Sequence, residues 1–231
     1  MKLLLLSNST NYAEPYMAWC AKLVSEFVGE ARSNILFVPY AAAGFSYEQY
    51  TSRVNQALSP YGIEAKDLSK AEDPKAAIRE ASAIFVGGGN SFQLLKCLQE
   101  KELISAIREQ VEHGVPYAGW SAGSNVAGQS IRTTNDMPIV EPQGFDALGL
   151  IPYQINPHFT NRTIPNHGGE TRTQRLEEFL AMNPESKVIC LPEGSYLSLE
   201  DGAMHYKGKE GGQLMDSLAV RDLSPGQSIV I

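Results

Sequence analysis

Short apolar runs that end in turn residues recur along the first half of the chain. They occupy residues 3–6, 35–38, 83–86 and 115–118, and the turns after them include Ser7-Asn8 and Gly87-Gly88-Gly89. A continuous apolar run of this length is typical of a strand that is buried on both faces. The pattern therefore predicts four buried β-strands.

The segments between these runs carry apolar residues at helical spacing. Residues 16–28 and 103–111 have apolar side chains three or four positions apart, which predicts amphipathic helices. Alternating strands and helices indicate an α/β fold, a three-layer sandwich in which helices flank a mostly parallel central sheet. A ligand site is then expected beyond the carboxyl ends of the strands.

The pattern changes in the second half of the chain. After Ser130 a long segment is rich in proline, asparagine and glycine, and no strong helix is expected before about residues 170–180. Long irregular segments often form active-site loops. From Val188 onward short strands alternate with turns, which we interpret as a β-rich extension of the same sheet. We expect one domain over residues 1–231.

Composition and charge limit the classes of partner. The net charge is −7, and no run of lysine and arginine is long enough to follow nucleic acid. The leucine run at residues 3–6 is shorter than the ~7–15 apolar residues of an export signal, and no run approaches the ~20 residues that span a bilayer. Three scattered cysteines, with no metal-ligand spacing, suit reduced thiols. We expect a cytoplasmic protein without membrane or nucleic-acid partners.

One sequence suggests a catalytic serine. Gly119-Trp120-Ser121-Ala122-Gly123 follows an apolar strand and precedes a stretch, residues 122–129, that is compatible with a helix. Small residues on both sides allow a sharp turn that exposes the serine hydroxyl above the sheet. The alternative is a glycine-rich turn in which Ser121 only caps the following helix.

A serine nucleophile needs a base, and the chain has four histidines. His158 is the first candidate because it follows a proline-fixed turn at the end of a short apolar stretch. His167 competes, although its glycine-rich surroundings indicate a flexible loop. His113 is expected to favour a helix C-terminus, and His205 is expected at the surface.

The base in turn needs an acid, and two carboxylates qualify. Glu193 follows an apolar strand at the expected edge, and Asp136 lies in the long irregular segment. Backbone amides of Gly88 and Gly89, together with that of Ala122, could form an oxyanion hole. The rival interpretation, a phosphate cradle, lacks the lysine and the glycine spacing of nucleotide-binding loops.

The order serine, histidine, glutamate differs from the order serine, acid, histidine of α/β-hydrolases. It is the order of the class I glutamine amidotransferase-like fold, with serine in place of cysteine. Six blocks spread over nearly the whole chain narrow this further: SNS (7–9), VPYA (38–41), FVGGGNSFQLL (85–95), GWSAGSN (119–125), INPHF (155–159) and LPEG (191–194). In these blocks the chain closely resembles the peptidase E family of α-aspartyl dipeptidases, which is related to cyanophycinase.

The resemblance implies an exopeptidase that hydrolyses dipeptides with an N-terminal aspartate and needs no metal or cofactor. Ser121 and His158 match the family's nucleophile and base, while the third member of the triad falls on either Glu193 or Asp136. Such a small peptide substrate would be bound by one or both of two arginines near a helix start, with a further contact from the glycine loop; the candidates are Arg172, Arg175 and Asn90. A monomer or a homodimer is expected.

Three alternatives remain at this stage. One is a cyanophycinase-like hydrolase acting on β-linked aspartyl-arginine, and another is a non-catalytic module that binds a small anion. The third, an amidotransferase-type glutaminase, requires a cysteine nucleophile, and none of Cys20, Cys97 and Cys190 occupies a turn like that of Ser121.

Overall fold

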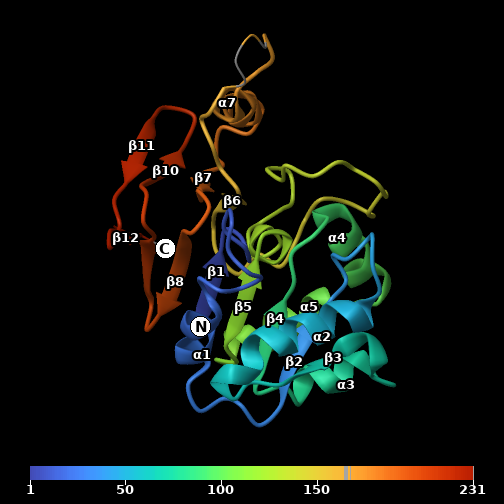
Figure 1. Ribbon diagram of the computed structural model, residues 1–231. Coiled ribbons are helices and arrows are strands. Elements are labelled where there is room, and N and C mark those ends of the chain that lie inside the picture. Colours follow the sequence, from blue (N-terminus) through green and yellow to red (C-terminus); the bar gives the residue numbers. More distant parts are fainter. Residues whose placement is uncertain (164–165, 167, 231) are drawn as a thin grey trace.

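The computed structural model describes residues 1–163, 166 and 168–230 (Figure 1). Its first half alternates strands and helices, whereas its last part is dominated by strands. In chain order the elements are β1 (Leu3–Leu6), α1 (Ala21–Val28), β2 (Ile35–Val38), α2 (Tyr47–Leu58), η1 (Ser59–Tyr61), β3 (Ala65–Asp67), η2 (Leu68–Lys70), α3 (Pro74–Arg79), β4 (Ala83–Val86), α4 (Ser91–Glu100), α5 (Ile104–Glu112), β5 (Tyr117–Trp120), α6 (Ala122–Asn125), β6 (Gln154–Asn156), α7 (Arg172–Met182), β7 (Val188–Cys190), β8 (Tyr196–Glu200), β9 (Ala203–Lys207), β10 (Gly212–Met215), β11 (Val220–Leu223) and β12 (Ser228–Ile229), where η marks a short 3-10 helix.

An eight-stranded sheet forms the centre of the molecule, in the order β12-β9-β8-β1-β5-β4-β2-β3. The five strands from β1 to β3 in this order pair in parallel, and β8, β9 and β12 are added antiparallel on the free side of β1. Parallel strands place their carboxyl ends at one edge, so the loops after β1, β4 and β5 meet there. Helix α7 lies beyond this edge (Figure 1).

Helices cover both faces of the parallel strands, as predicted. Successive strand residues point to opposite faces, and in β1 Leu4 and Leu6 pack with α1 and α2, whereas Leu3 and Leu5 pack with α4 and α5. Each of the four leucines is at most 1% exposed. The opening apolar run is therefore a buried strand of a three-layer α/β fold. A strand buried on only one face would have shown alternating apolar and polar residues instead.

The fourth strand lies two residues later than the sequence predicted. Residues 115–118 were expected, but Val115 donates its N–H to Gln110 at the end of α5 and Pro116 has no N–H to donate. Strand β5 instead runs to Trp120, which pairs with Leu6 of β1. The serine at position 121 therefore follows the strand directly.

The predicted extension of the sheet is only partly correct. Strands β8, β9 and β12 do extend it, but β10 and β11 pair with β7 and β6 in a separate four-stranded sheet, ordered β11-β10-β7-β6. Hydrophobic patterning could not separate the two sheets, because the short strands of both carry the same turn signals. Within the part of the chain described here, no helix is long and apolar enough to cross a membrane.

Candidate active site

Ser121 occupies a sharp turn between β5 and α6. Its backbone has φ +52° and ψ −113°, a region that residues with a side chain rarely adopt. A Cβ on Gly119 would lie 2.4 Å from the Gly123 carbonyl oxygen, and one on Gly123 would lie 2.1 Å from that of Val86. The two glycines are therefore required by close packing. The Ser121 side chain does not cap α6, so the capping interpretation is wrong.

The structure brings Ser121, His158 and Glu193 into one hydrogen-bonded chain. His158 Nε2 lies 3.0 Å from Ser121 Oγ, and His158 Nδ1 lies 3.0 Å from Glu193 Oε1. A carboxylate can only accept, so Nδ1 carries the proton toward Glu193 and Nε2 of the neutral ring accepts from the serine. The His158 and Glu193 side chains are 40% and 53% exposed. The arrangement can therefore remove a proton from Ser121 at a solvent-accessible edge.

Two polar residues at the end of β1 hold the loops of the histidine and the glutamate. Ser7 Oγ accepts the backbone N–H of His158 at 2.9 Å and donates to the Leu191 carbonyl at 2.8 Å. Asn8 Oδ1 accepts the N–H of Gly194 at 2.8 Å, next to Glu193. Sequence reasoning treated Ser7 and Asn8 only as a turn. Their position after a buried strand, at the edge where the site was expected, is the signal that could have found them.

Backbone amides in the glycine loop beside Ser121 and in the turn directly after it have no acceptor among the described residues. A Cβ on Gly88 would lie 3.0 Å from Ser121 Cβ, so the glycine loop lies directly against the nucleophile candidate. Within the described residues, the N–H groups of Gly88, Gly89 and Ala122 have no hydrogen-bond acceptor. Neighbouring amides in the loop are occupied, because Gly87 donates to Val38 and Asn90 to Ala41. The unoccupied amides provide donors for a negatively charged oxygen.

Asp136 does not contact His158. Its Oδ2 accepts the backbone N–H of Ser91 at 2.7 Å and the Thr134 hydroxyl at 3.1 Å, at the first turn of α4. A carboxylate is favourable there because the helix N-terminus carries partial positive charge. The structure thus brings Glu193, and not Asp136, to the histidine.

Asn90 is the N-cap of α4. Its Oδ1 accepts the N–H of Gln93 at 3.0 Å, and its Nδ2 donates to the Met137 carbonyl at 2.8 Å. The side chain predicted to bind substrate therefore already makes two structural hydrogen bonds, and one Nδ2 hydrogen remains for another acceptor.

Both predicted arginines line a cavity of about 330 Å³. In the sequence, the first residue of its lining follows His158 by two positions. Its lining comprises Thr160, Arg162, Thr163, Gly169, Glu170, Thr171, Arg172 and Arg175. Arg172 is half-buried, and Arg175 is exposed with its Nε 3.7 Å from Glu170 Oε2. Burial and the nearby charge of Arg175 lower the Arg172 pKa, and Asp136 raises it. The guanidinium remains charged at neutral pH, so the cavity is cationic. Sequence reasoning missed Arg162.

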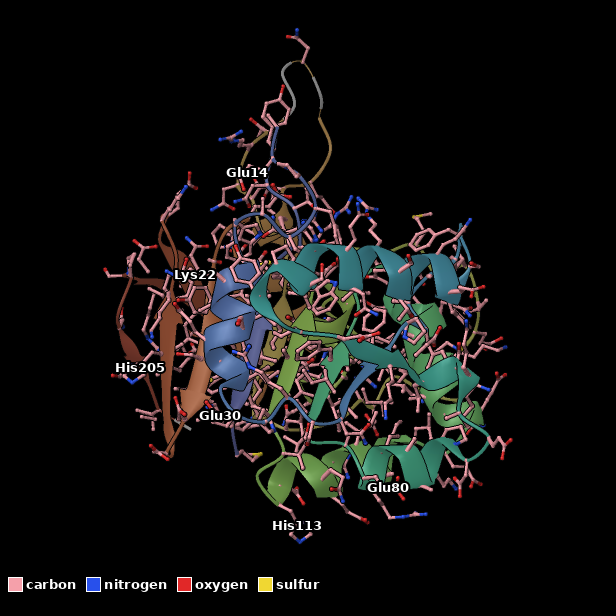
Figure 2. All side chains as sticks on the ribbon, turned by 60° about the horizontal axis from the view of Figure 1, so that its bottom comes forward. Glu14, Lys22, Glu30, Glu80, His113 and His205 are labelled. Atoms are coloured by element: carbon pink, nitrogen blue, oxygen red, sulfur yellow. The ribbon has the colours of Figure 1, made fainter. Side chains whose placement is uncertain are left out.

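His113 and His205 lie away from the serine. Figure 2 shows His113 and His205 at the periphery of the molecule, where His113 Nδ1 lies 2.7 Å from the Glu109 carbonyl and His205 Nδ1 lies 3.1 Å from Ser228 Oγ. The expected roles of His113 at a helix end and of His205 on a short strand agree with these positions. His167, the competing base, lies outside the described residues.

The cysteines and acidic groups give no metal centre among the residues that the structure describes, since no cluster there combines three or more His, Cys, Asp or Glu side chains. Cys20, Cys97 and Cys190 are all unpaired thiols and all buried. None of them lies in the turn after β5.

Comparison with known proteins identifies a family. The model of Peptidase family S51 matches residues 3–207. The chain is 47% identical over 209 residues to Peptidase E of Nostoc sp., covering 90% of this chain and 86% of that one. It is 46% identical over 211 residues to Peptidase E of Shewanella denitrificans, covering 91% and 89%.

A solved structure shares the fold. The crystal structure of a peptidase from an acI-B1 Actinobacterium superimposes with a TM-score of 0.73 at 20% sequence identity, covering 100% of this chain and 96% of that one. At this identity the likeness concerns the fold, which agrees with the predicted α/β architecture.

Proposed function

Because the chain belongs to peptidase family S51, we propose that it is a serine exopeptidase that hydrolyses dipeptides with an N-terminal L-aspartate. The observation that carries this proposal is the hydrogen-bonded chain of Ser121, His158 and Glu193 at 3.0 Å spacings. Relatives that are 46–47% identical over most of their length bear the name Peptidase E.

In the first step His158 Nε2 takes the proton of Ser121 as the serine oxygen attacks the scissile carbonyl. Glu193 holds Nδ1–H and stabilises the imidazolium that forms. His158 then gives its proton to the departing amine, and the N-terminal residue remains as an acyl group on Ser121. Water, activated by the same histidine, releases free aspartate and regenerates the serine.

The tetrahedral intermediate carries negative charge on the former carbonyl oxygen. The unoccupied amides of Gly88, Gly89 and Ala122 are the donors assigned to it. Removing one such donor typically costs about 10²–10³ in kcat. Two of the donors come from the loop after β4 and one from the first residue of α6, so the oxyanion hole joins two strand ends.

The substrate aspartate is assigned to the cationic cavity. A buried carboxylate needs a cation, and a guanidinium offers two parallel hydrogen bonds that match its geometry. Half-buried Arg172 is the principal candidate, because partial burial strengthens its interaction with an anion. Arg162 and Arg175 line the same cavity and add positive charge. A neutral asparagine or a longer glutamate would fit this arrangement less well.

The test compares release of the N-terminal residue from Asp-Leu, Asn-Leu, Glu-Leu, β-Asp-Leu and β-Asp-Arg by wild type and Ser121→Ala, with folding checked by circular dichroism. Rapid release from Asp-Leu alone, lost in the folded mutant, is expected. Acetyl-Asp-Leu should resist cleavage, because an exopeptidase of this kind requires the free amine.

Other outcomes assign other functions. Preferred cleavage of β-Asp-Arg would indicate the cyanophycinase-like alternative. No turnover of any dipeptide by folded wild type, with binding retained in Ser121→Ala, would indicate a non-catalytic binding module. Cytoplasmic location, the absence of a cofactor, and a monomeric or homodimeric state remain predictions, which cell fractionation, metal analysis and light scattering would test.

A further inference from the structure

A buried tyrosine links the strand before Ser121 to the glycine loop. Tyr50, in helix α2, is 4% exposed, and its hydroxyl lies 2.9 Å from Trp120 Nε1 and 3.0 Å from the Gly88 carbonyl oxygen. Trp120 immediately precedes Ser121, and Gly88 lies against it. The tyrosine hydroxyl thus touches both segments that meet at the nucleophile, although the mechanism above gives it no contact with the substrate.

Donor and acceptor chemistry fixes the direction of these hydrogen bonds. The indole Nε1–H can only donate, so the Tyr50 oxygen accepts from Trp120. The single hydroxyl proton of Tyr50 is then free to go to the Gly88 carbonyl, which can only accept. Burial raises the pKa of Tyr50, and the hydroxyl therefore keeps this proton throughout the neutral pH range.

The bond to Gly88 also orients the next amide. In a planar trans peptide the carbonyl of one residue and the N–H of the next point in opposite directions. Because the Gly88 carbonyl points to buried Tyr50, the Gly89 N–H points away from the core, and Gly89 is exposed to solvent. This is one of the amides without an acceptor among the described residues.

Packing leaves the tyrosine and the loop little freedom. The Phe37 ring stacks on the Trp120 ring, with the ring centroids 5.7 Å apart. It also meets the Tyr50 ring edge-on, with the centroids 5.0 Å apart. A Cβ on Gly87 would lie 2.7 Å from the Tyr50 ring, and one on Gly89 would lie 2.3 Å from the Ala41 carbonyl oxygen. The loop therefore has only glycine-compatible geometry, and the hydroxyl selects the orientation of its central peptide.

We propose that Tyr50, held by Trp120, is a positioning residue of the oxyanion hole: its hydroxyl fixes the Gly88–Gly89 peptide so that the Gly89 N–H faces the oxygen that becomes negatively charged. This inference deepens the proposed function and rests on it for the identity of the substrate. It assigns a role in catalysis to a side chain that touches neither substrate nor any of the reacting atoms.

Tyr50→Phe removes the hydroxyl and keeps the ring. The expected result is a kcat for Asp-Leu that is roughly 10-fold lower with KM unchanged, because the oxyanion forms only in the transition state. Reaction with a fluorophosphonate gives a second readout that needs no dipeptide. There Ser121 Oγ forms a bond to phosphorus, the P–F bond breaks and fluoride leaves, and the serine proton passes to His158. The same donors stabilise the negative charge that develops on the phosphonyl oxygen in the pentacoordinate transition state. The labelling rate should fall by a similar factor.

Tyr206→Phe is the matched control. Tyr206 is fully buried and its hydroxyl donates to the Glu210 carbonyl at 2.6 Å, in the C-terminal strands. This variant should lose thermal stability to a similar extent as Tyr50→Phe and keep wild-type kcat and labelling rate. A merely structural role of Tyr50 predicts that the two variants behave alike.

The outcomes separate the inference from the proposed function. If folded Tyr50→Phe keeps both the wild-type kcat and the wild-type labelling rate, the positioning role is wrong. If wild type is labelled at Ser121 but releases no aspartate, the proposed substrate is wrong, and the labelling rates of the two variants still decide the role of Tyr50. Absence of labelling in folded wild type would overturn both.

Discussion

Ser7 Oγ accepts the backbone N–H of His158 at 2.9 Å, across 151 positions of the chain. The same oxygen donates to the Leu191 carbonyl at 2.8 Å, on the loop that leads to Glu193. Ser7 is fully buried at the carboxyl end of β1. One small side chain thus holds His158, which itself has φ +53°, and the loop of Glu193 at a fixed spacing.

Ser7→Ala should therefore impair catalysis as well as stability. The change leaves the His158 N–H without its acceptor, whereas the Leu191 carbonyl still accepts the N–H of Phe159 at 2.9 Å. An unsatisfied buried donor costs about 1–3 kcal/mol of unfolding free energy. We expect kcat to fall roughly 10-fold, since a small displacement of His158 lengthens its contact with Ser121. Urea denaturation and Asp-Leu kinetics measure the two effects.

Ser82→Ala is the control for this variant. Ser82 also accepts a backbone N–H, from Asn34 at 2.9 Å, and donates to a carbonyl, that of Ala31 at 3.0 Å. It precedes β4 and lies at the opposite end of the sheet from the site. The Ser82→Ala variant should lose a similar amount of unfolding free energy as Ser7→Ala and keep the wild-type kcat. Equal kinetic losses in both variants would contradict a specific role for Ser7.

Glu193→Gln tests the acid of the proposed triad. The amide keeps the size of the side chain but removes the charge that stabilises protonated His158, so kcat should fall by roughly 10²-fold. Asp136→Asn should change kcat by less than about threefold and lower the unfolding free energy by about 0.5–1 kcal/mol, because Asp136 accepts the Ser91 N–H at the start of α4. The reverse ranking in kcat would assign the role to Asp136.

Patterning alone predicted the centre of the fold. The runs at residues 3–6, 35–38 and 83–86 became β1, β2 and β4 with the expected bounds, because strands buried on both faces leave an unbroken apolar signature. Helix α2 was missed although it begins with a capping box of Ser46 and Gln49. The separate sheet of β6, β7, β10 and β11 was also missed, since strand pairing depends on contacts between distant segments.

The residues of the candidate site could be predicted where the residue type itself indicates a chemical role. Ser121, His158 and Glu193 each follow an apolar stretch, and the structure brings them together. Ser7 also follows an apolar stretch, but a serine in a turn has no chemistry that marks it as a positioning residue, and Tyr50 carried no such signal at all. A tyrosine in an amphipathic helix normally indicates core packing, and only the three-dimensional arrangement shows that its hydroxyl meets Gly88.

Arg172→Gln tests the assignment of the cationic cavity. KM for Asp-Leu should rise by roughly 10–100-fold with a smaller change in kcat, because the substrate carboxylate loses its charged partner. The preference for Asp-Leu over Asn-Leu should shrink in parallel. Arg175→Gln is the comparison, since Arg175 is exposed and lies beside Glu170, and it should raise KM by less than about threefold. A larger effect at Arg175 would transfer the role to that residue.

Thiol reagents should leave the enzyme active. Burial raises the pKa of the Cys20 thiol to about 12 and also raises that of Cys190, so neither forms the reactive thiolate near neutral pH. Iodoacetamide at pH 8 is expected to modify these two cysteines only after unfolding in urea, while a fluorophosphonate inactivates the native protein at Ser121. Mass spectrometry of both reactions, with Ser121→Ala as control, measures the modified sites. Rapid inactivation by iodoacetamide alone would point to cysteine chemistry of the glutaminase type and against a serine nucleophile.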